Sequence, residues 1–334
     1  MSAIVLATIN AKWIHPSYAL RLLKANLGPL EGDAQILEFA LRQPLAEKVD
    51  AILAARPRIL ALSVSIWNHA ATMELLDALE ELWHTDSSSP APDCGQPHPS
   101  GPGPVRGLRP VIVMGGPEVS WLEEDAPILR LSDWLIRGEG EHAFRVLCAA
   151  LLSTSEPIFS PEVAKRTGAG GRIIEALPVY LDSIDRAYRL YSDEDLARKL
   201  TYMEASRGCP FGCRFCLSAR DRTVRTVPLD RFLDDMDVLI ARGAKSFKFL
   251  DRTFNLDIER ARSILAFFLE RLKPGMFVHF EMVPARFPLE LRDLLTRFQP
   301  GTLRLEIGIQ TLNPAVAKAI HRGSNPDREL ETLR

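Results

Sequence analysis

The sequence predicts an α/β protein with two domains, an N-terminal doubly wound parallel sheet and a C-terminal partial (β/α) barrel. Three observations support this. Short apolar runs alternate with amphipathic helical segments, the apolar runs are continuous, and a Gly-rich stretch separates two series of such units. Continuous apolar strands are typical of parallel sheets because helices cover both of their faces. A chain of 334 residues is also long enough for two hydrophobic cores.

The composition is that of an ordinary globular protein. The 41 Lys and Arg residues and 43 Asp and Glu residues give a formal net charge of -2, and 46% of the residues are hydrophobic. These values exclude a largely disordered chain and a polybasic tail that binds nucleic acid. No uncharged apolar stretch reaches about 18 residues, and Met1–Asn10 lacks the features of a signal peptide. We therefore expect a cytoplasmic protein without a membrane span.

Five units that each begin with a strand are expected in residues 1–152, which we assign to the N-terminal domain. The expected strands are Ile4–Ile9, Gln35–Phe39, Ile59–Ile66, Val111–Met114 and Trp134–Arg137. The expected helices are Ser17–Leu27, Leu45–Ala55, Ala70–Trp83 and Glu141–Leu152. Gly28 and Pro57 fit this assignment, because each stands where a helix is expected to end.

Two segments interrupt the pattern. Residues 85–110, which include Cys94, are rich in Ser, Pro and Gly. Such a composition buries too little apolar surface to offset its ordering entropy, so we expect a disordered surface insertion. Residues 153–200 begin with a loose stretch that contains Gly168–Gly171, and they are expected to connect the two domains.

Four further units are expected in residues 201–334. The expected strands are Tyr202–Ser206, Ser246–Leu250, Phe277–Met282 and Leu303–Ile309. The expected helices are Leu229–Arg242, Ile258–Leu272 and Leu289–Phe298, and another begins near Pro314. A parallel sheet of this size leaves an apolar edge that needs a cover. We therefore expect the first four units of a barrel that is truncated at the C-terminus.

Three cysteines form the most informative cluster in the sequence. Cys209, Cys213 and Cys216 lie within eight residues, directly after the first expected strand of the second domain. Three thiolates on one loop can hold three irons of a [4Fe-4S] cluster and leave the fourth iron open to a ligand from outside the protein. Structural zinc is an alternative, but it needs a fourth ligand, and no second cysteine pair or nearby histidine precedes His279.

The run Glu204–Cys216 resembles the signature of the radical S-adenosylmethionine (SAM) superfamily. In that family SAM chelates the open iron, and reduction of the cluster cleaves SAM to a 5'-deoxyadenosyl radical. The resemblance implies that the three cysteines hold a [4Fe-4S] cluster and that the backbone of Phe215 lies near the adenine of SAM. It also implies an electron donor such as flavodoxin or ferredoxin.

The same resemblance implies further contacts to SAM. Asp251 follows the second barrel strand, where the family places a polar or acidic group near the SAM amino group, although a helix-capping role explains it equally well. Glu306 and Gln310 lie in a motif like that of the family's fourth strand, which approaches the ribose or methionyl part of SAM. A charge in an apolar strand needs a partner or a cavity. Glu281 is a lesser candidate, since a salt bridge at the rim accounts for it as well.

The loops of the N-terminal domain are expected to bind a large cofactor, because parallel strands gather them at one edge of the sheet. Gly-rich turns at Met114–Glu118 and Arg137–Glu141 follow the fourth and fifth strands. Glycine there permits either close approach of the backbone to a ligand or a tight turn. Neither turn is the G-x-G-x-x-G sequence that binds dinucleotides, so nicotinamide and flavin dinucleotides are disfavoured.

Together with the cysteine signature, these turns resemble the cobalamin (B12)-binding radical SAM proteins, whose N-terminal domain is Rossmann-like. The segments Lys12–Ser17 and Ser63–Asn68 also resemble that family. The resemblance implies a cobalamin site, to which we assign Ser63, Ser65, Gly115, Gly116, Gly138 and Glu139.

The D-x-H-x-x-G motif, which supplies a histidine to cobalt in methionine-synthase-type domains, is absent. We therefore expect neither His15 nor His69 to ligate the cobalt. Trp13 or Trp67 is expected either to cover the lower face of cobalamin or to pack in the core.

The resemblance implies an enzyme that binds a [4Fe-4S] cluster, SAM and cobalamin, and that methylates an unactivated carbon. Radical rearrangement without methyl transfer is an alternative. A non-catalytic protein that binds a cofactor or zinc is another, because the barrels of the family continue for two more strands. No basic patch with interleaved aromatic residues indicates a nucleic acid, so we expect a small-molecule or peptide substrate.

Overall fold

The structure of the chain, a computed structural model, describes residues 2–85, 109–153, 164–166, 172–284, 286–323 and 325–333. It divides into two compact units, Met1–Val179 with Ile184–Leu190, and Tyr180–Ser183 with Tyr191–Arg334. The expected insertion at 85–110, including Cys94, lies almost entirely outside the described residues, as does most of the loose stretch 153–171. Among the described residues, no helix combines the length and hydrophobicity that a membrane span requires.

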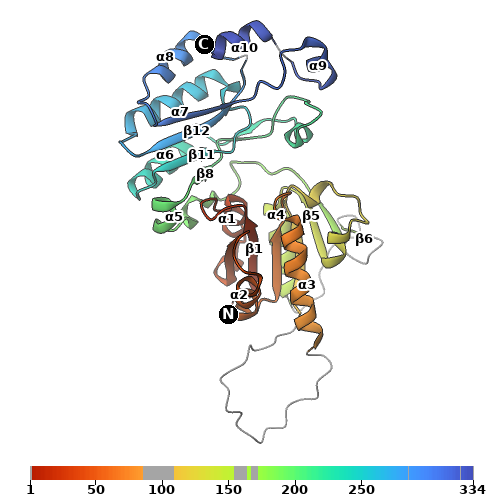
Figure 1. Ribbon diagram of the computed structural model, residues 1–334. Coiled ribbons are helices and arrows are strands. Elements are labelled where there is room, and N and C mark those ends of the chain that lie inside the picture. The colour runs from red at the N-terminus through yellow and green to blue at the C-terminus, as the bar shows by residue number, and fades with distance from the viewer. Residues whose placement is uncertain are drawn as a thin grey trace, which may run out of the picture. The chain divides into compact units, whose positions relative to one another are not determined.

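The described part of the first unit contains a seven-stranded sheet with helices on its two faces (Figure 1). The strand order is β2-β1-β3-β4-β5-β7-β6, and every neighbouring pair is parallel except β6 and β7. The strands are β1 (Ile4–Asn10), β2 (Ala34–Ala40), β3 (Ile59–Ser63), β4 (Val111–Gly115), β5 (Trp134–Gly138), β6 (Ala164–Arg166) and β7 (Arg172–Ala176). The α-helices are α1 (Tyr18–Ala25), α2 (Leu45–Ala55), α3 (His69–Thr85) and α4 (Gly140–Leu152).

Both faces of the first sheet are apolar, which explains why its strands have continuous hydrophobic sequences. Val5 and Ala7 pack with residues of α2 and α3, whereas Ile4 and Leu6 pack with residues of α1 and α4. Full burial of a side chain such as Leu or Ile stabilises the fold by about 1.5–3 kcal/mol. The α/β fold with a parallel, doubly wound first sheet is therefore confirmed.

The expectation that residues 153–200 only connect the two domains is wrong in one respect, because they include strand β7 of the first sheet. This strand pairs with β5 in register from Trp134–Arg172 to Gly138–Ala176. The chain after it also belongs to the first unit, where the rings of Tyr18 and Tyr188 stack with centroids 5.6 Å apart. The strand has only five residues and follows a Gly-rich run, so its sequence alone gives no long apolar signal.

The second unit contains a four-stranded parallel sheet with the order β13-β12-β11-β8. Its strands are β8 (Thr201–Met203), β11 (Ser246–Phe249), β12 (Phe277–Met282) and β13 (Leu303–Ile307), and a separate antiparallel pair joins β9 (Ser206–Arg207) to β10 (Arg225–Thr226). The helices are α5 (Asp193–Arg198), α6 (Leu229–Ala241), α7 (Ile258–Arg271), α8 (Leu289–Thr296), α9 (Pro314–Ala319) and α10 (Pro326–Leu333). Strands adjacent in sequence are adjacent in the sheet, as in a (β/α) barrel.

The two faces of the second sheet differ in polarity. Phe247, Phe249 and Phe280 are buried in an aromatic cluster with Phe232 of α6 and Phe268 of α7. Side chains alternate along a strand, so the intervening residues point to the opposite face. There the sheet carries polar side chains, namely Lys248, His279, Glu281, Arg304 and Glu306. One face thus forms the core and the other is available for polar ligands.

The first strand of the second sheet is shorter than expected. β8 ends at Met203, and Ser206 belongs instead to the antiparallel pair. A buried carboxylate causes this break, because Asp251 accepts hydrogen bonds from the backbone N–H of Ala205 at 3.0 Å and from the hydroxyl of Ser206 at 2.5 Å. The carboxyl ends of β8 and β11 are therefore joined through one side chain.

Two glycines expected at the cofactor site have a structural reason. Gly116 has a φ of +111°, and a Cβ there would lie 2.5 Å from the carbonyl oxygen of Val64. Gly138 has a φ of +87°, and its Cβ would lie 2.8 Å from the carbonyl oxygen of Ala176. The loops at the edge of the first sheet thus pack backbone against backbone, and the tight-turn interpretation is sufficient for both positions.

We predict that Gly116→Ala lowers the free energy of unfolding by about 1–3 kcal/mol, because alanine combines an unfavourable φ with a backbone clash. Gly32→Ala is the control, since nothing lies within 4 Å of a Cβ at that position. Urea denaturation followed by circular dichroism measures both variants. Equal stability of Gly116→Ala and the wild type would contradict the packing described for these loops.

A second prediction concerns pH. The pKa of Asp251 is raised from 3.8 to about 7, chiefly by burial and to a smaller extent by nearby Glu204, against the opposing hydrogen bonds from Ser206 and Ala205. Between pH 4 and 7 the folded state therefore holds a proton that the unfolded chain has released, so stability falls as the pH rises through this window. We expect this group to contribute a slope of at most about 1.4 kcal/mol per pH unit.

Asp251→Asn is expected to remove that contribution, because the amide does not titrate. Urea denaturation at several pH values between 4 and 8 measures the free energy of unfolding of both proteins. The difference in stability between the variant and the wild type should shift in favour of the variant as the pH rises. A difference that is constant over this range would show that Asp251 is already ionised in the folded protein.

Candidate functional site

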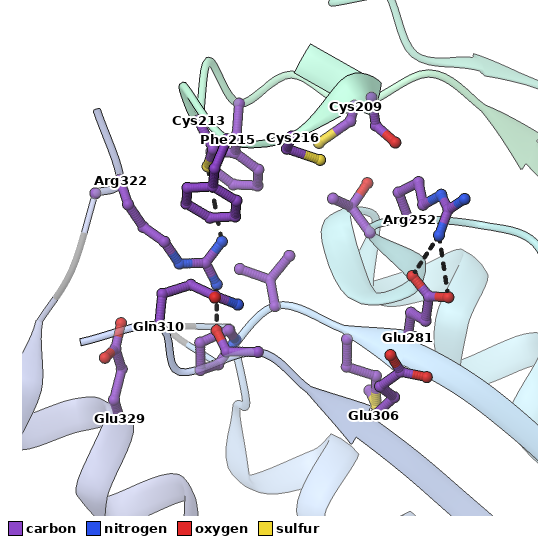
Figure 2. Close-up of a pocket in the computed structure, with 18 residues that line it drawn as sticks. Cys209, Cys213, Phe215, Cys216, Arg252, Glu281, Glu306, Gln310, Arg322 and Glu329 are labelled. Carbon is purple, nitrogen blue, oxygen red and sulfur yellow. Dashed lines mark hydrogen bonds and ion pairs between the residues drawn. The ribbon is translucent and has the colours of Figure 1, made fainter. Parts of the chain in front are cut away.

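A pocket in the second unit is formed by the cysteine loop and the segments that follow the sheet strands (Figure 2). Its wall includes all three clustered cysteines, Arg252 and Thr253 after β11, residues 281–284 at the end of β12, and Glu306 on β13. The turn after α9 completes it with Arg322. Parallel strands bring these segments together, because their carboxyl ends lie at one edge of the sheet.

The cysteine loop is closed by backbone hydrogen bonds. The N–H of Cys209 donates to the carbonyl oxygen of Asp221 at 2.9 Å, and the N–H of Cys216 donates to that of Cys213 at 3.1 Å. Gly208 has a φ of +98°, and a Cβ there would lie 2.2 Å from the carbonyl oxygen of Thr223. Only glycine fits this crossing, so the residue before the first cysteine fixes where the loop begins.

The three thiols are unbridged and interact electrostatically. Cys209 and Cys213 are buried, whereas Cys216 is half-buried. Burial raises the pKa of Cys209, and the charges of Cys216 and Cys213 raise it further, against the opposing effects of the N–H of Phe211 and the guanidinium of Arg322. Three thiolates in one place therefore need a compensating positive charge, such as that of bound iron.

The donor set fits an iron–sulfur cluster. In a [4Fe-4S] cluster each thiolate binds a different iron, so the sulfurs need not surround a single point. Among the residues that the structure describes, no group of three or more His, Cys, Asp or Glu side chains could hold a metal ion. The hydroxyl of Thr253 is buried at the same pocket and has no hydrogen-bond partner in the described part of the chain. A polar ligand in the pocket would give it one.

The pocket contains three of the four residues expected at SAM. Phe215 is exposed, with 54% of its surface accessible, and it lines the pocket together with Glu306 and Gln310. Oε2 of Glu306 lies 3.4 Å from Nε2 of His279 and 4.0 Å from Nζ of Lys248. The positive charge of Lys248 and the polar ring of His279 account for a charged residue within strand β13.

Asp251, the fourth expected residue, does not line the pocket. Its side chain is buried and holds the chain just before the cysteine loop, at Ala205 and Ser206. The alternative role of Asp251 as a helix cap is wrong, because Asp257 is the residue that caps α7. Glu281 lines the pocket and forms a salt bridge with Arg252 at 3.1 Å.

Two residues that build the pocket, one behind its wall and one in it, were not expected from the sequence. Asn255 is fully buried and binds the next loop through Val283, whose N–H it accepts at 2.7 Å and whose carbonyl oxygen it donates to at 3.0 Å. Arg322 donates to the sulfur of Cys213 at 3.7 Å. The polar run that follows the second expected strand was the only signal for Asn255, and Arg322 had none because its partner is 109 residues away.

The residues expected at cobalamin lie at the carboxyl edge of the first sheet. Ser63 and Gly115 end β3 and β4, and Gly116 and Gly138 pack against neighbouring backbone as described above. The N–H of Ser65 donates to Asn68 at 2.7 Å. The carboxylate of Glu139 accepts the N–H of Val179 at 2.7 Å, so it stabilises a local loop.

Large apolar side chains are exposed at the same edge. Trp13 and Ile14 follow β1, Ile66 and Trp67 follow β3, and Trp121 follows β4. Trp13 is 51% exposed and Trp67 is 54% exposed, so the expectation that they pack in the core is wrong. An exposed apolar patch rimmed by polar residues is typical of a binding surface.

His69, the histidine that was not expected to bind cobalt, has a partner within the protein. Its Nδ1 lies 3.1 Å from Oε1 of Glu118.

Comparison with known proteins identifies the second unit. Residues 203–334 match the model of the radical SAM superfamily. An uncharacterized methyltransferase of Pyrococcus horikoshii is 25% identical over 237 residues, which cover 67% of this chain and 50% of that protein. The ribosomal protein uS12 methylthiotransferase RimO of Pelodictyon phaeoclathratiforme is 25% identical over 168 residues, which cover 47% of this chain and 39% of that protein.

The fold of the chain is similar to that of the radical SAM methyltransferase TsrM from Kitasatospora setae, with a TM-score of 0.67 and 17% identity. The match covers 100% of this chain and 65% of TsrM, whose structure holds a tryptophan substrate and a SAM analog. Another TsrM structure holds cobalamin and a [4Fe-4S] cluster. The chain spans half or less of the length of each of the two curated relatives described above. The part of the chain that matches the radical SAM superfamily, residues 203–334, contains the three-cysteine loop and its pocket.

Proposed function

We propose that this chain is a cobalamin-dependent radical SAM enzyme that methylates an unactivated carbon. The observation that carries this proposal is the set of three unbridged cysteines on one closed loop, which opens into a pocket within a radical SAM domain. The methyltransferase and methylthiotransferase relatives support the reaction class, and the cobalamin bound by TsrM supports the third cofactor.

Cys209, Cys213 and Cys216 would hold the [4Fe-4S] cluster, and the adjoining pocket would hold SAM. When bound, these cofactors and cobalamin supply a carbon radical and a methyl group for transfer. The residues of the chain bind and orient SAM. The exposed ring and backbone of Phe215 border the adenine, and Glu306 and Gln310 offer a carboxylate and an amide to the ribose or methionyl part. The buried hydroxyl of Thr253 supplies one more hydrogen bond to the bound molecule.

Cobalamin would lie on the carboxyl edge of the first sheet. Its site comprises Ser63, Ser65, Gly115, Gly116, Gly138 and Glu139. The backbone at Gly116 and Gly138 packs closely against neighbouring backbone, which leaves room for a ligand above these loops. The exposed indole of Trp67 offers that ligand an apolar surface. Burial of such an indole under a ligand is favourable because it removes apolar surface from water.

The substrate is a small molecule or a peptide, and the electron donor is a flavodoxin or ferredoxin. The pocket is lined by charges of both signs, those of Glu281, Glu306 and Glu329 and those of Arg252 and Arg322. This mixture suits zwitterionic SAM, whose amino and carboxylate groups need partners of opposite sign.

The experiment that tests the proposal compares the wild type with Cys213→Ala after anaerobic reconstitution. We expect about four irons and four sulfides per wild-type chain, and SAM with a reductant should yield 5'-deoxyadenosine. Cys213→Ala should lose the cluster and the product. Cys148→Ala is the matched control, because that cysteine is fully buried in the first unit. One zinc without iron, or equal product yields from all three proteins, would overturn the assignment.

A separate prediction addresses cobalamin. We expect Trp67→Ala to weaken the binding of hydroxocobalamin by at least about tenfold, because the lost apolar contact is worth about 1.5 kcal/mol or more. Val146→Ala, an exposed apolar residue on α4, is the control and should bind as the wild type does. Absorbance titration measures the affinity. Unchanged binding by Trp67→Ala would exclude the indole from the cobalamin site.

A further inference from the structure

Arg322 makes a contact that the proposed function has not used. Its Nη1 lies 3.7 Å from the sulfur of Cys213 and donates a hydrogen bond to it. Its Nη2 donates to the carbonyl oxygen of Gly308, at the end of β13. Figure 2 shows the guanidinium group directed from the turn after α9 toward the cysteine loop. A cation therefore stands against one of the three expected cluster ligands.

The position of this cation is fixed by the fold. The N–H of Arg322 donates to the carbonyl oxygen of Ala317 at 2.9 Å, which closes the end of α9. The N–H of Arg214, inside the cysteine loop, donates to the carbonyl oxygen of Ile320 at 3.0 Å. The loop and the arginine-bearing turn are thus bound to each other, and the guanidinium needs no reorganisation to reach the sulfur.

Both acceptors of Arg322 are neutral while Cys213 is a thiol, so the contact becomes stronger when the sulfur is a thiolate. The guanidinium remains charged at every accessible pH.

We propose that Arg322 raises the reduction potential of the iron–sulfur cluster by donating an N–H···S hydrogen bond to the Cys213 thiolate. This inference rests on the proposed function. During reduction the cluster takes one electron from an external low-potential donor, and its net charge becomes more negative by one, while no bond forms or breaks. A fixed cation and a hydrogen-bond donor stabilise the more negative state more strongly, so reduction becomes easier. Arg322 is thus a positioning and tuning residue that acts through the cluster.

The test is a potentiometric titration of the reconstituted protein, in which electron paramagnetic resonance measures the reduced cluster at each potential. We expect the midpoint potential to become more negative in the order wild type, Arg322→Lys, Arg322→Gln. Lysine keeps the charge but not the planar fork of donors, and glutamine keeps a donor without the charge. Arg262→Ala, which removes a surface arginine paired with Glu259 on α7, is the control and should match the wild type.

The outcomes separate this inference from the proposed function. If the wild type assembles no cluster, the proposed function fails. If all variants bind equal amounts of iron and sulfide but share one midpoint potential, only the role of Arg322 fails. If Arg322→Gln loses its cluster, the comparison of Arg322→Lys with the wild type decides, and equal potentials in these two proteins would overturn the proposal.

Discussion

The buried carboxylate of Asp251 is the interaction on which the geometry of the second unit depends. It lies at the end of β11 and accepts hydrogen bonds from Ala205 and Ser206, directly after β8. A buried carboxyl group needs such donors because it has left water. Together these bonds end the strand and direct the chain into the cysteine loop. The cysteine loop therefore starts from a point fixed by two neighbouring strands.

From that point, the local fold of the loop follows from backbone constraints. Gly208 permits the crossing with Thr223, and the carbonyl oxygen of Asp221 accepts the N–H of Cys209. Charges around the pocket are paired, as in Arg252 with Glu281 and Glu306 with Lys248. Arg322 differs because one of its acceptors is a cysteine sulfur. The pocket is therefore preorganised around the cysteines, a property that favours precise binding of a large cofactor.

In the first unit, close backbone packing likewise fixes the loops at the edge of the sheet. In the part of this unit that the structure describes, helices cover both faces of the sheet and leave the loops at its carboxyl edge open to a ligand. Gly116 and Gly138 bring these loops into backbone contact with their neighbours, while Trp13 and Trp67 remain exposed. Apolar side chains at a closely packed edge form a surface that suits a large, flat and partly apolar cofactor.

The sequence alone determined the α/β fold and the three-cysteine motif, because both depend on neighbours along the chain. Continuous apolar runs mark β1, β3 and β4 closely, and the spacing of the cysteines is a local property. The tertiary structure alone decided the short strand β7, the role of Asp251 as a loop anchor and the contact of Arg322 with Cys213. These features depend on which strand ends meet in space, and a local pattern contains no information about a partner 109 residues away.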